Sequence, residues 1–226
     1  MALNLLMLGP PGAGKGTQAE RFARASGIPK ISTGDILREA VHEKSDIGLK
    51  AMATMDRGEL VGDEVMIGIV RERLEREDAR SGFVLDGFPR TVAQAVALDG
   101  IMSNRDPLIV VDIVVPEAEL VLRLGTRMIC EACGTGAPVA GRAGAACAKC
   151  GGRLVQRADD NQAVVLERLK VYHRQSEPLV EYYRVRPTFR SIDGVQPPDR
   201  VAADLAAAVE AAGTGTVGTV GHGVQG

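Results

Sequence analysis

The chain contains no tryptophan, and aromatic residues make up only 3% of its 226 residues. Leu, Ile, Val, Met and Ala must therefore supply most of the core. Long apolar runs are also missing, because the apolar start, residues 1–8, is too short to span a bilayer. It lacks the basic segment and small-residue cleavage site of a signal peptide. We expect a buried strand there, in a cytoplasmic protein with no membrane partner.

An excess of charge of either sign is absent as well. The formal net charge is −2, with 45% hydrophobic and 25% charged residues, values that are ordinary for a globular protein and exclude a disordered or fibrous one. Duplex-binding proteins usually carry a clustered excess of Lys and Arg, so the balance argues against a nucleic-acid partner. We expect one core with smaller inserted modules, working as a monomer.

Cysteine is rare and confined to one place. The four cysteines form two Cys-x-x-Cys pairs, Cys130 with Cys133 and Cys147 with Cys150, thirteen residues apart. In a cytosolic chain this usage favours metal over disulfides. Four thiolates would make a closed tetrahedral zinc site of the structural kind. Paired thiols or a disulfide remain the alternative.

Short apolar runs alternate with longer segments of helical periodicity, the pattern of an α/β fold with a parallel sheet. The expected strands are residues 3–8, 82–85, 108–115 and 189–192, with 29–32 as a fifth. The expected helices are residues 18–25, 35–42, 64–76, 91–102, 117–127, 161–183 and 199–212. Residues 130–152 follow neither period and indicate an insertion held by its cysteines. The Gly-rich segment 213–226 predicts a flexible tail.

A glycine-rich loop follows the first expected strand, with the sequence Gly9-Pro-Pro-Gly12-Ala13-Gly14-Lys15-Gly16-Thr17. Its place between a strand and a helix is the context of a P-loop, whose backbone N–H groups hold phosphate oxygens. The strict pattern has Ser or Thr directly after Lys. Here Gly16 intervenes, so the usual Mg²⁺-ligand role is not transferred to Thr17. A plain Gly-rich turn is the alternative.

This variant loop, together with Ser32-Thr33-Gly34-Asp35 and Asp86-Gly87-Phe88-Pro89-Arg90, resembles the adenylate kinases over residues 1–212. The resemblance implies a five-stranded parallel P-loop core at 1–31, 62–127 and 160–212, an AMP-binding module at 32–61, and a mobile zinc-containing lid at 128–159. It also implies reversible phosphoryl transfer from Mg·ATP to AMP, giving two ADP.

For the acceptor, the resemblance implies that Thr33 and Gln94 read the adenine of AMP and that Arg38 contacts its phosphate. The remaining AMP-binding residues would be Leu60, Val61, Gly87, Arg90, Arg157 and Arg168. Simpler local roles stay open: Thr33 or Asp35 could cap a helix, and Thr91 with Gln94 fits a capping box. UMP/CMP kinases carry Ala and Asn where this chain has Thr33 and Gln94, which favours AMP.

For catalysis, the resemblance places five cations around the transferring group: Lys15, Arg90, Arg127, Arg157 and Arg168. Such reactions depend on positioning and charge neutralisation, and the anionic acceptor phosphate needs no general base. The ATP site would comprise Gly12, Ala13, Gly14, Lys15, Gly16, Thr17, Arg123, Arg127 and Gln196. Asp86 and Asp159 would organise Mg²⁺ and its waters, as would Asp160, which could instead cap the helix that begins at Asn161.

Two other functions remain open from the sequence. The chain could phosphorylate a different nucleoside monophosphate or use GTP, because donor bases are read largely through backbone groups. It could also be a nucleotide-dependent nucleic-acid-binding module that uses its cysteine-containing insertion. That second reading predicts basic or aromatic residues near the cysteines, where only Arg142 and Lys149 occur.

Overall fold

The computed structural model describes residues 2–137 and 143–214. A five-stranded parallel sheet in the order β2-β3-β1-β4-β7 forms its centre. The strands are β1 (Leu3–Leu8), β2 (Lys30–Ser32), β3 (Gly82–Asp86), β4 (Leu108–Val114) and β7 (Phe189–Asp193). The predicted α/β fold class and all five predicted strands are confirmed.

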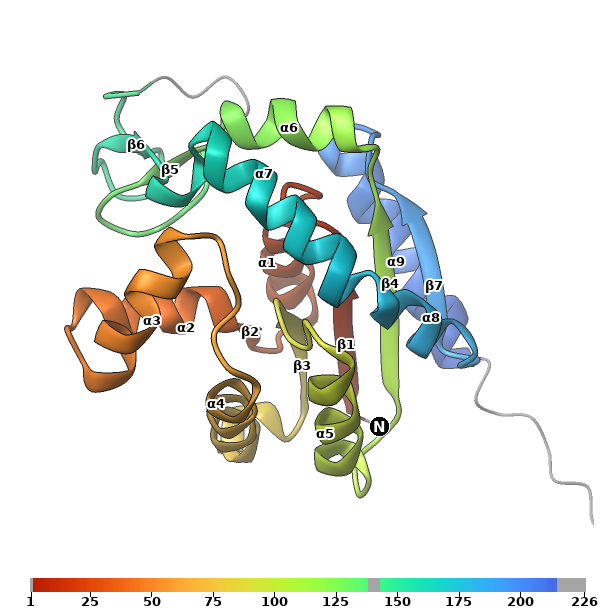
Figure 1. Ribbon diagram of the computed structural model, residues 1–226. Coiled ribbons are helices and arrows are strands. Elements are labelled where there is room, and N and C mark those ends of the chain that lie inside the picture. Colours follow the sequence, from red (N-terminus) through yellow and green to blue (C-terminus); the bar gives the residue numbers. More distant parts are fainter. Residues whose placement is uncertain (1, 138–142, 215–226) are drawn as a thin grey trace, which may run out of the picture.

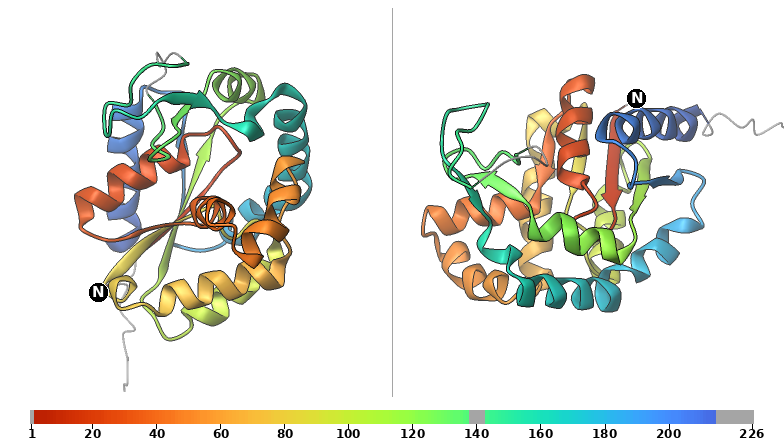
Figure 2. Two further views of the ribbon diagram at one scale, coloured as in Figure 1. Left: turned by 90° about the vertical axis from the view of Figure 1, so that its left-hand side faces the viewer. Right: turned by 90° about the horizontal axis from the view of Figure 1, so that it is seen from above.

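Helices cover both faces of the sheet (Figures 1 and 2). Those expected are α1 (Lys15–Ser26), α2 (Thr33–His42), α4 (Asp63–Glu75), α5 (Val92–Met102), α6 (Glu117–Gly125) and α9 (Pro198–Thr214). The structure adds α3 (Asp46–Asp56), which the sequence analysis did not predict. Single turns of 3₁₀-helix lie at Glu77–Ala79 and Ala158–Asp160.

Strand alternation places the core on both sides of the sheet. Leu5 and Met7 point to the side of α1 and α9, and Leu6 and Leu8 point to the side of α4, α5 and α8 (Pro178–Arg184). All four side chains are at most 6% exposed. Because apolar burial is the main favourable term in folding, the two-sided core fixes the sheet. Because all five strands are parallel, their carboxyl ends share one edge.

The predicted helix over 161–183 is wrong as a single element. The chain forms α7 (Gln162–Val171), a π-helical turn (Tyr172–Ser176) and α8 (Pro178–Arg184). Pro178 has no N–H to donate within a continuous helix. The chain widens ahead of it, and the N–H of Glu177 donates to the carbonyl of Tyr172 at 2.9 Å.

The cysteine-containing insertion holds a small antiparallel sheet, β5 (Met128–Cys130) with β6 (Leu154–Gln156), where no regular element was expected. Figure 1 shows it projecting beyond α6 and α7. The predicted flexible tail falls mostly outside the described residues, since Gly213 and Thr214 belong to α9 and residues 215–226 are not described. Among the described residues, no helix has both the length and the apolar character needed to cross a membrane.

Candidate active site

The loop between β1 and α1 lies at the carboxyl edge of the sheet. Its first residue, Gly9, has φ +131°, and a Cβ there would lie 2.6 Å from the carbonyl oxygen of Ile113 on β4. Only glycine fits this approach. The ammonium group of Lys15 donates to the carbonyls of Gly9 and Pro10 at 2.7 and 2.8 Å. The loop thus keeps its lysine folded against its own backbone.

A single large cavity of about 1990 Å³ opens in front of this loop. Ligand pockets usually measure roughly 300–1,000 Å³, so the space exceeds that of one small ligand. Of the residues expected to bind a nucleotide or Mg²⁺, Asp160 is not among the described residues that line the cavity. The others all line it: Gly12, Ala13, Gly14, Lys15, Gly16, Thr17, Thr33, Arg38, Leu60, Val61, Asp86, Gly87, Arg90, Gln94, Arg123, Arg127, Arg157, Asp159, Arg168 and Gln196.

The cations of the cavity crowd one another. The pKa of Lys15 is lowered to about 8, first by burial and then by neighbouring guanidinium groups, against an opposing effect of Asp86. Burial and Arg168 lower the pKa of Arg90 to about 10. Burial, Arg38 and Arg127 do the same for Arg157. The lowered pKa values show that the charged forms of these side chains are destabilised by burial and by one another. A bound anion with several negative charges would stabilise them, so the cavity favours such an anion.

Two of these arginines are fixed by one buried carboxylate. Arg127 donates to both carboxylate oxygens of Asp160 at 2.6 Å, and Arg168 donates to Oδ1 of Asp160 at 2.9 Å. The side chain of Asp160 is fully buried. The alternative that Asp160 caps the following helix is wrong, because Asn161 occupies that position and its side chain accepts the N–H of Val164.

The neighbouring carboxylate of Asp159 is nearer to solvent. It pairs with Arg157 at 3.4 Å and with Arg168 at 3.1 Å. Arg123 instead pairs with Glu119, a partner from the same helix that the sequence analysis did not name. The spacing of four residues along α6 is the signal that predicts such a pair.

Thr33 and Gln94 come from different elements and face the same cavity. The hydroxyl of Thr33 donates to the carbonyl of Gly87 at 2.8 Å, as does Nε of Arg90. Ser32, rather than Thr33 or Asp35, caps α2 by accepting the N–H of Asp35. The alternative that Thr33 or Asp35 is the N-cap is therefore wrong, and Asp35 instead pairs with Arg38.

The capping-box alternative is correct for only one of its two contacts. Thr91 caps α5 by accepting the N–H of Gln94 at 3.2 Å. The side-chain oxygen of Gln94 accepts the N–H of Arg90 at 2.8 Å, not that of Thr91. Its amide nitrogen donates to Asp63 at 2.7 Å. Asp63 carries no motif signal in the sequence, and only the folded chain brings it to Gln94.

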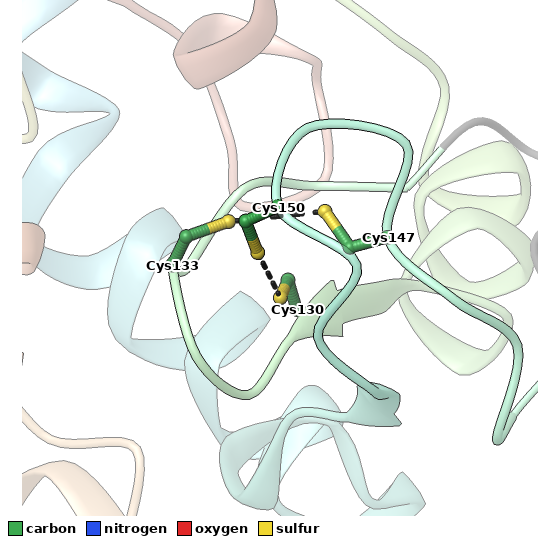
Figure 3. A group of neighbouring side chains, drawn as sticks. All are labelled: Cys130, Cys133, Cys147 and Cys150. Atoms are coloured by element: carbon green, nitrogen blue, oxygen red, sulfur yellow. Dashed lines mark hydrogen bonds between the residues drawn. The ribbon is translucent and has the colours of Figure 1, made fainter.

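The four cysteines converge in the insertion (Figure 3). Their sulfur atoms all lie within 4.8 Å of one another, with Cys130 to Cys150 at 3.4 Å and Cys133 to Cys147 at 3.8 Å. A tetrahedral zinc with bonds of about 2.3 Å requires sulfur separations of about 3.8 Å. Each pair lies in a tight turn, in which an N–H donates to the carbonyl of Cys130 or Cys147. The donor set therefore fits a structural zinc ion.

A glycine-rich loop at the carboxyl edge of a parallel sheet, facing a cationic cavity, defines the class of P-loop nucleotide-binding proteins. The adenylate kinase family model matches residues 7–188. An adenylate kinase of Archaeoglobus fulgidus is 48% identical over 215 residues, covering 92% of this chain and 98% of the relative. One from Geobacter sp. is 49% identical over 214 residues, covering 92% and 100%. One from Geobacillus sp. is 50% identical over 208 residues, covering 90% and 96%.

The chain belongs to the adenylate kinase family. The reaction is the reversible transfer of a phosphoryl group from ATP to AMP, which yields two molecules of ADP.

Proposed function

We propose that this chain catalyses the reaction within the cavity in front of the P-loop, with the donor at Gly12–Thr17 and the acceptor beside Thr33 and Gln94. One observation carries the proposal. A single cavity is lined both by the P-loop lysine and by the two polar side chains expected to read the acceptor base. Its volume of about 1990 Å³ supports room for two nucleotides.

In the proposed reaction, an oxygen of the AMP phosphate forms a bond to the γ-phosphorus of ATP. The bond from that phosphorus to the β–γ bridging oxygen breaks, and ADP leaves with the electron pair. No proton needs to be removed from the attacking group, so the protein acts by position and charge. Five cations would stabilise the negative charge on the transferring phosphoryl group: Lys15, Arg90, Arg127, Arg157 and Arg168.

Mg²⁺ would arrive with ATP and neutralise part of the phosphate charge. Asp86 and Asp159 line the cavity and offer carboxylate oxygens, the ligands that this ion prefers. Asp86 ends β3 beside the P-loop, where its Oδ2 lies 3.4 Å from the position of a Cβ at Gly16. We propose that these two carboxylates orient the waters of the metal.

We further propose that residues 32–61 form the AMP-binding module and residues 128–159 a lid, with a core at 1–31, 62–127 and 160–212. Lid residues Cys133 and Lys149 and module residues Arg38 and Leu60 line the same cavity, so closure of either part would exclude water from the phosphates. Cys130, Cys133, Cys147 and Cys150 would hold one zinc ion that fixes the shape of the lid.

We also propose that the enzyme works as a cytoplasmic monomer without a nucleic-acid partner. The two Cys-x-x-Cys pairs are clustered as metal ligands rather than paired as disulfides, a cysteine usage typical of reducing compartments. The near-balanced charge supports the absence of a nucleic-acid footprint.

The test is a coupled assay with Mg·ATP or Mg·GTP as donor and AMP, UMP, CMP or GMP as acceptor, beside a nucleic-acid binding titration. AMP is expected to give by far the highest kcat/KM, because the wrong base leaves buried polar groups unpaired. A comparable kcat/KM for UMP would contradict the roles given to Thr33 and Gln94. Tight binding of a nucleic acid would support the alternative class of function.

A further inference from the structure

Gln94 is held in one orientation by two partners, the backbone of Arg90 and the side chain of Asp63. Its oxygen accepts the backbone N–H of Arg90 at 2.8 Å, and its nitrogen donates to Oδ1 of Asp63 at 2.7 Å. The side chain is buried, at 1% exposure. Gln94 lines the cavity, whereas Asp63 is not among the described residues that do so.

The two partners have opposite hydrogen-bonding character. A backbone N–H can only donate, and an ionised carboxylate can only accept. If the Gln94 amide turned over, its nitrogen would face the N–H of Arg90 and its oxygen would face the carboxylate of Asp63. Both contacts would become repulsive, and buried polar groups left without partners are costly.

Asp63 is itself fixed from a second side. Its other oxygen, Oδ2, accepts the hydroxyl of Thr91 at 3.0 Å. The Thr91 oxygen in turn accepts the N–H of Gln94 as the cap of α5. Because Asp63 is the first residue of α4, the carboxylate connects the starts of two helices and has little freedom to move.

A primary amide has two N–H groups and two lone pairs on its oxygen. After the bonds to Asp63 and Arg90, Gln94 keeps one N–H and one lone pair, in a fixed order. A 6-aminopurine presents the matching order, with an acceptor at N1 and a donor at the 6-amino group. A 6-oxopurine presents the reverse order, a donor at N1 and an acceptor at O6.

We propose that Asp63 is a positioning residue that sets the acceptor specificity of the enzyme for 6-aminopurine over 6-oxopurine nucleotides. It acts through Gln94 and does not touch the substrate. The inference rests on the proposed role of Gln94 in contacting the acceptor base. Removing Asp63 leaves only the N–H of Arg90 to orient the amide.

The experiment measures kcat, KM and melting temperature for Asp63→Ala, with AMP and IMP as alternative acceptors and Mg·ATP as donor. Loss of a hydrogen bond to a charged partner corresponds to roughly a tenfold effect. The ratio of kcat/KM for AMP to that for IMP is expected to fall about tenfold, mainly through a higher KM for AMP. The KM for Mg·ATP is expected to stay unchanged.

Two variants separate positioning from a structural effect. Asp63→Asn can still accept from Gln94 and can donate to the oxygen of Thr91, so it should keep the AMP-to-IMP ratio within about threefold. Glu64→Ala removes the same charge from the exposed first turn of α4, and it should leave the ratio unchanged.

Gln94→Leu distinguishes the two ways in which the inference can fail. If Gln94→Leu abolishes the preference while Asp63→Ala keeps it within twofold, Asp63 has no part in specificity. If Gln94→Leu also keeps the preference, the assigned role of Gln94 is wrong, and the inference fails with it. An equal loss for AMP and IMP in Asp63→Ala, or a loss in Asp63→Asn as large as in Asp63→Ala, would likewise overturn it.

Discussion

Arg127 and Asp160 form a bidentate pair in which Nε and Nη2 of the arginine each lie 2.6 Å from a carboxylate oxygen. The same carboxylate accepts from Arg168. One arginine precedes β5 and the other lies on α7, so Asp160 sets the distance between two cations from separate elements. Fixed spacing matters because a guanidinium group stabilises a transition state only when it is already in place.

Replacing Asp160 by Asn should therefore reduce kcat by roughly tenfold or more, because charge-assisted hydrogen bonds to two arginines weaken. The melting temperature should fall as well. Steady-state kinetics and thermal unfolding measure both effects. Asp99→Asn is the matched control, since Asp99 forms a similar bidentate pair with Arg186. This control should lower stability but leave kcat unchanged, and an equal kcat loss in both variants would contradict the role of Asp160.

Lys15→Met and Arg90→Ala should each lower kcat by at least ~10²-fold, because each removes charge that counts most in the transition state. Single-turnover and steady-state measurements with Mg·ATP and AMP provide the test. Arg73→Ala is a suitable control, since Arg73 pairs with Asp78 and does not line the cavity. A change confined to KM would show instead that the side chain binds the substrate and the transition state equally well.

The lowered pKa of Lys15 predicts a fall in kcat/KM for Mg·ATP as the pH rises through about 8, because the free enzyme then loses the ammonium charge. Bound phosphates favour the charged form, so kcat at saturating ATP should fall only at a higher pH. The pH profiles of both parameters, with the coupling enzymes kept in excess, test this. A flat kcat/KM up to pH 10 would contradict the assignment.

The contribution of Lys15 to stability should rise with pH, whereas its contribution to kcat/KM should fall. Between pH 8 and 10.5 the folded chain binds fewer protons at this group than the unfolded chain does. The contribution of Lys15 to the free energy of unfolding therefore rises with pH across that window. Below about pH 8 the buried charge is a constant destabilising term. Lys15→Met should remove this pH dependence, which urea unfolding at several pH values can measure.

The purified protein should contain about one zinc ion per chain, measurable by elemental analysis. Cys133→Ser combined with Cys147→Ser should lower the melting temperature and increase proteolysis near residues 130–150, because Cys130, Cys147 and Leu154 are the only buried core residues in the part of the insertion that the structure describes. Metal binding then supplies much of its folding free energy. Much of kcat should remain at low temperature, with some loss if the lid closes less accurately over the phosphates. A metal-free protein, or an inactive variant of unchanged stability, would contradict this account.

The sequence could predict the elements whose signals are local. The alternation of apolar strands with helices predicted the five parallel strands and most helices. The glycine-rich loop predicted the phosphate site because its function depends on backbone geometry near one point in the chain. The paired cysteines likewise predicted their own convergence. For all three, the residues that determine the structure lie close together in the sequence.

Helix α3 shows why other elements were missed. Its buried face consists of Gly48 and Ala51, while Ile47, Leu49 and Met52 are exposed. A Cβ on Gly48 would lie 2.0 Å from the carbonyl oxygen of Ala40 on α2. The helix forms because small residues allow a close approach to α2. The sequence of this helix therefore lacks an apolar periodicity that would indicate a buried face.

The sequence by itself determined the fold class, the phosphate loop and the cysteine pairs, because local propensity and apolar period specify them. Only the tertiary structure decided which carboxylates from distant parts of the chain hold Arg127 and Gln94. Asp160 reaches Arg127 across 33 positions, and Asp63 reaches Gln94 across 31. Contacts at such separations depend on how helices pack on the sheet, and no single stretch of sequence encodes that packing.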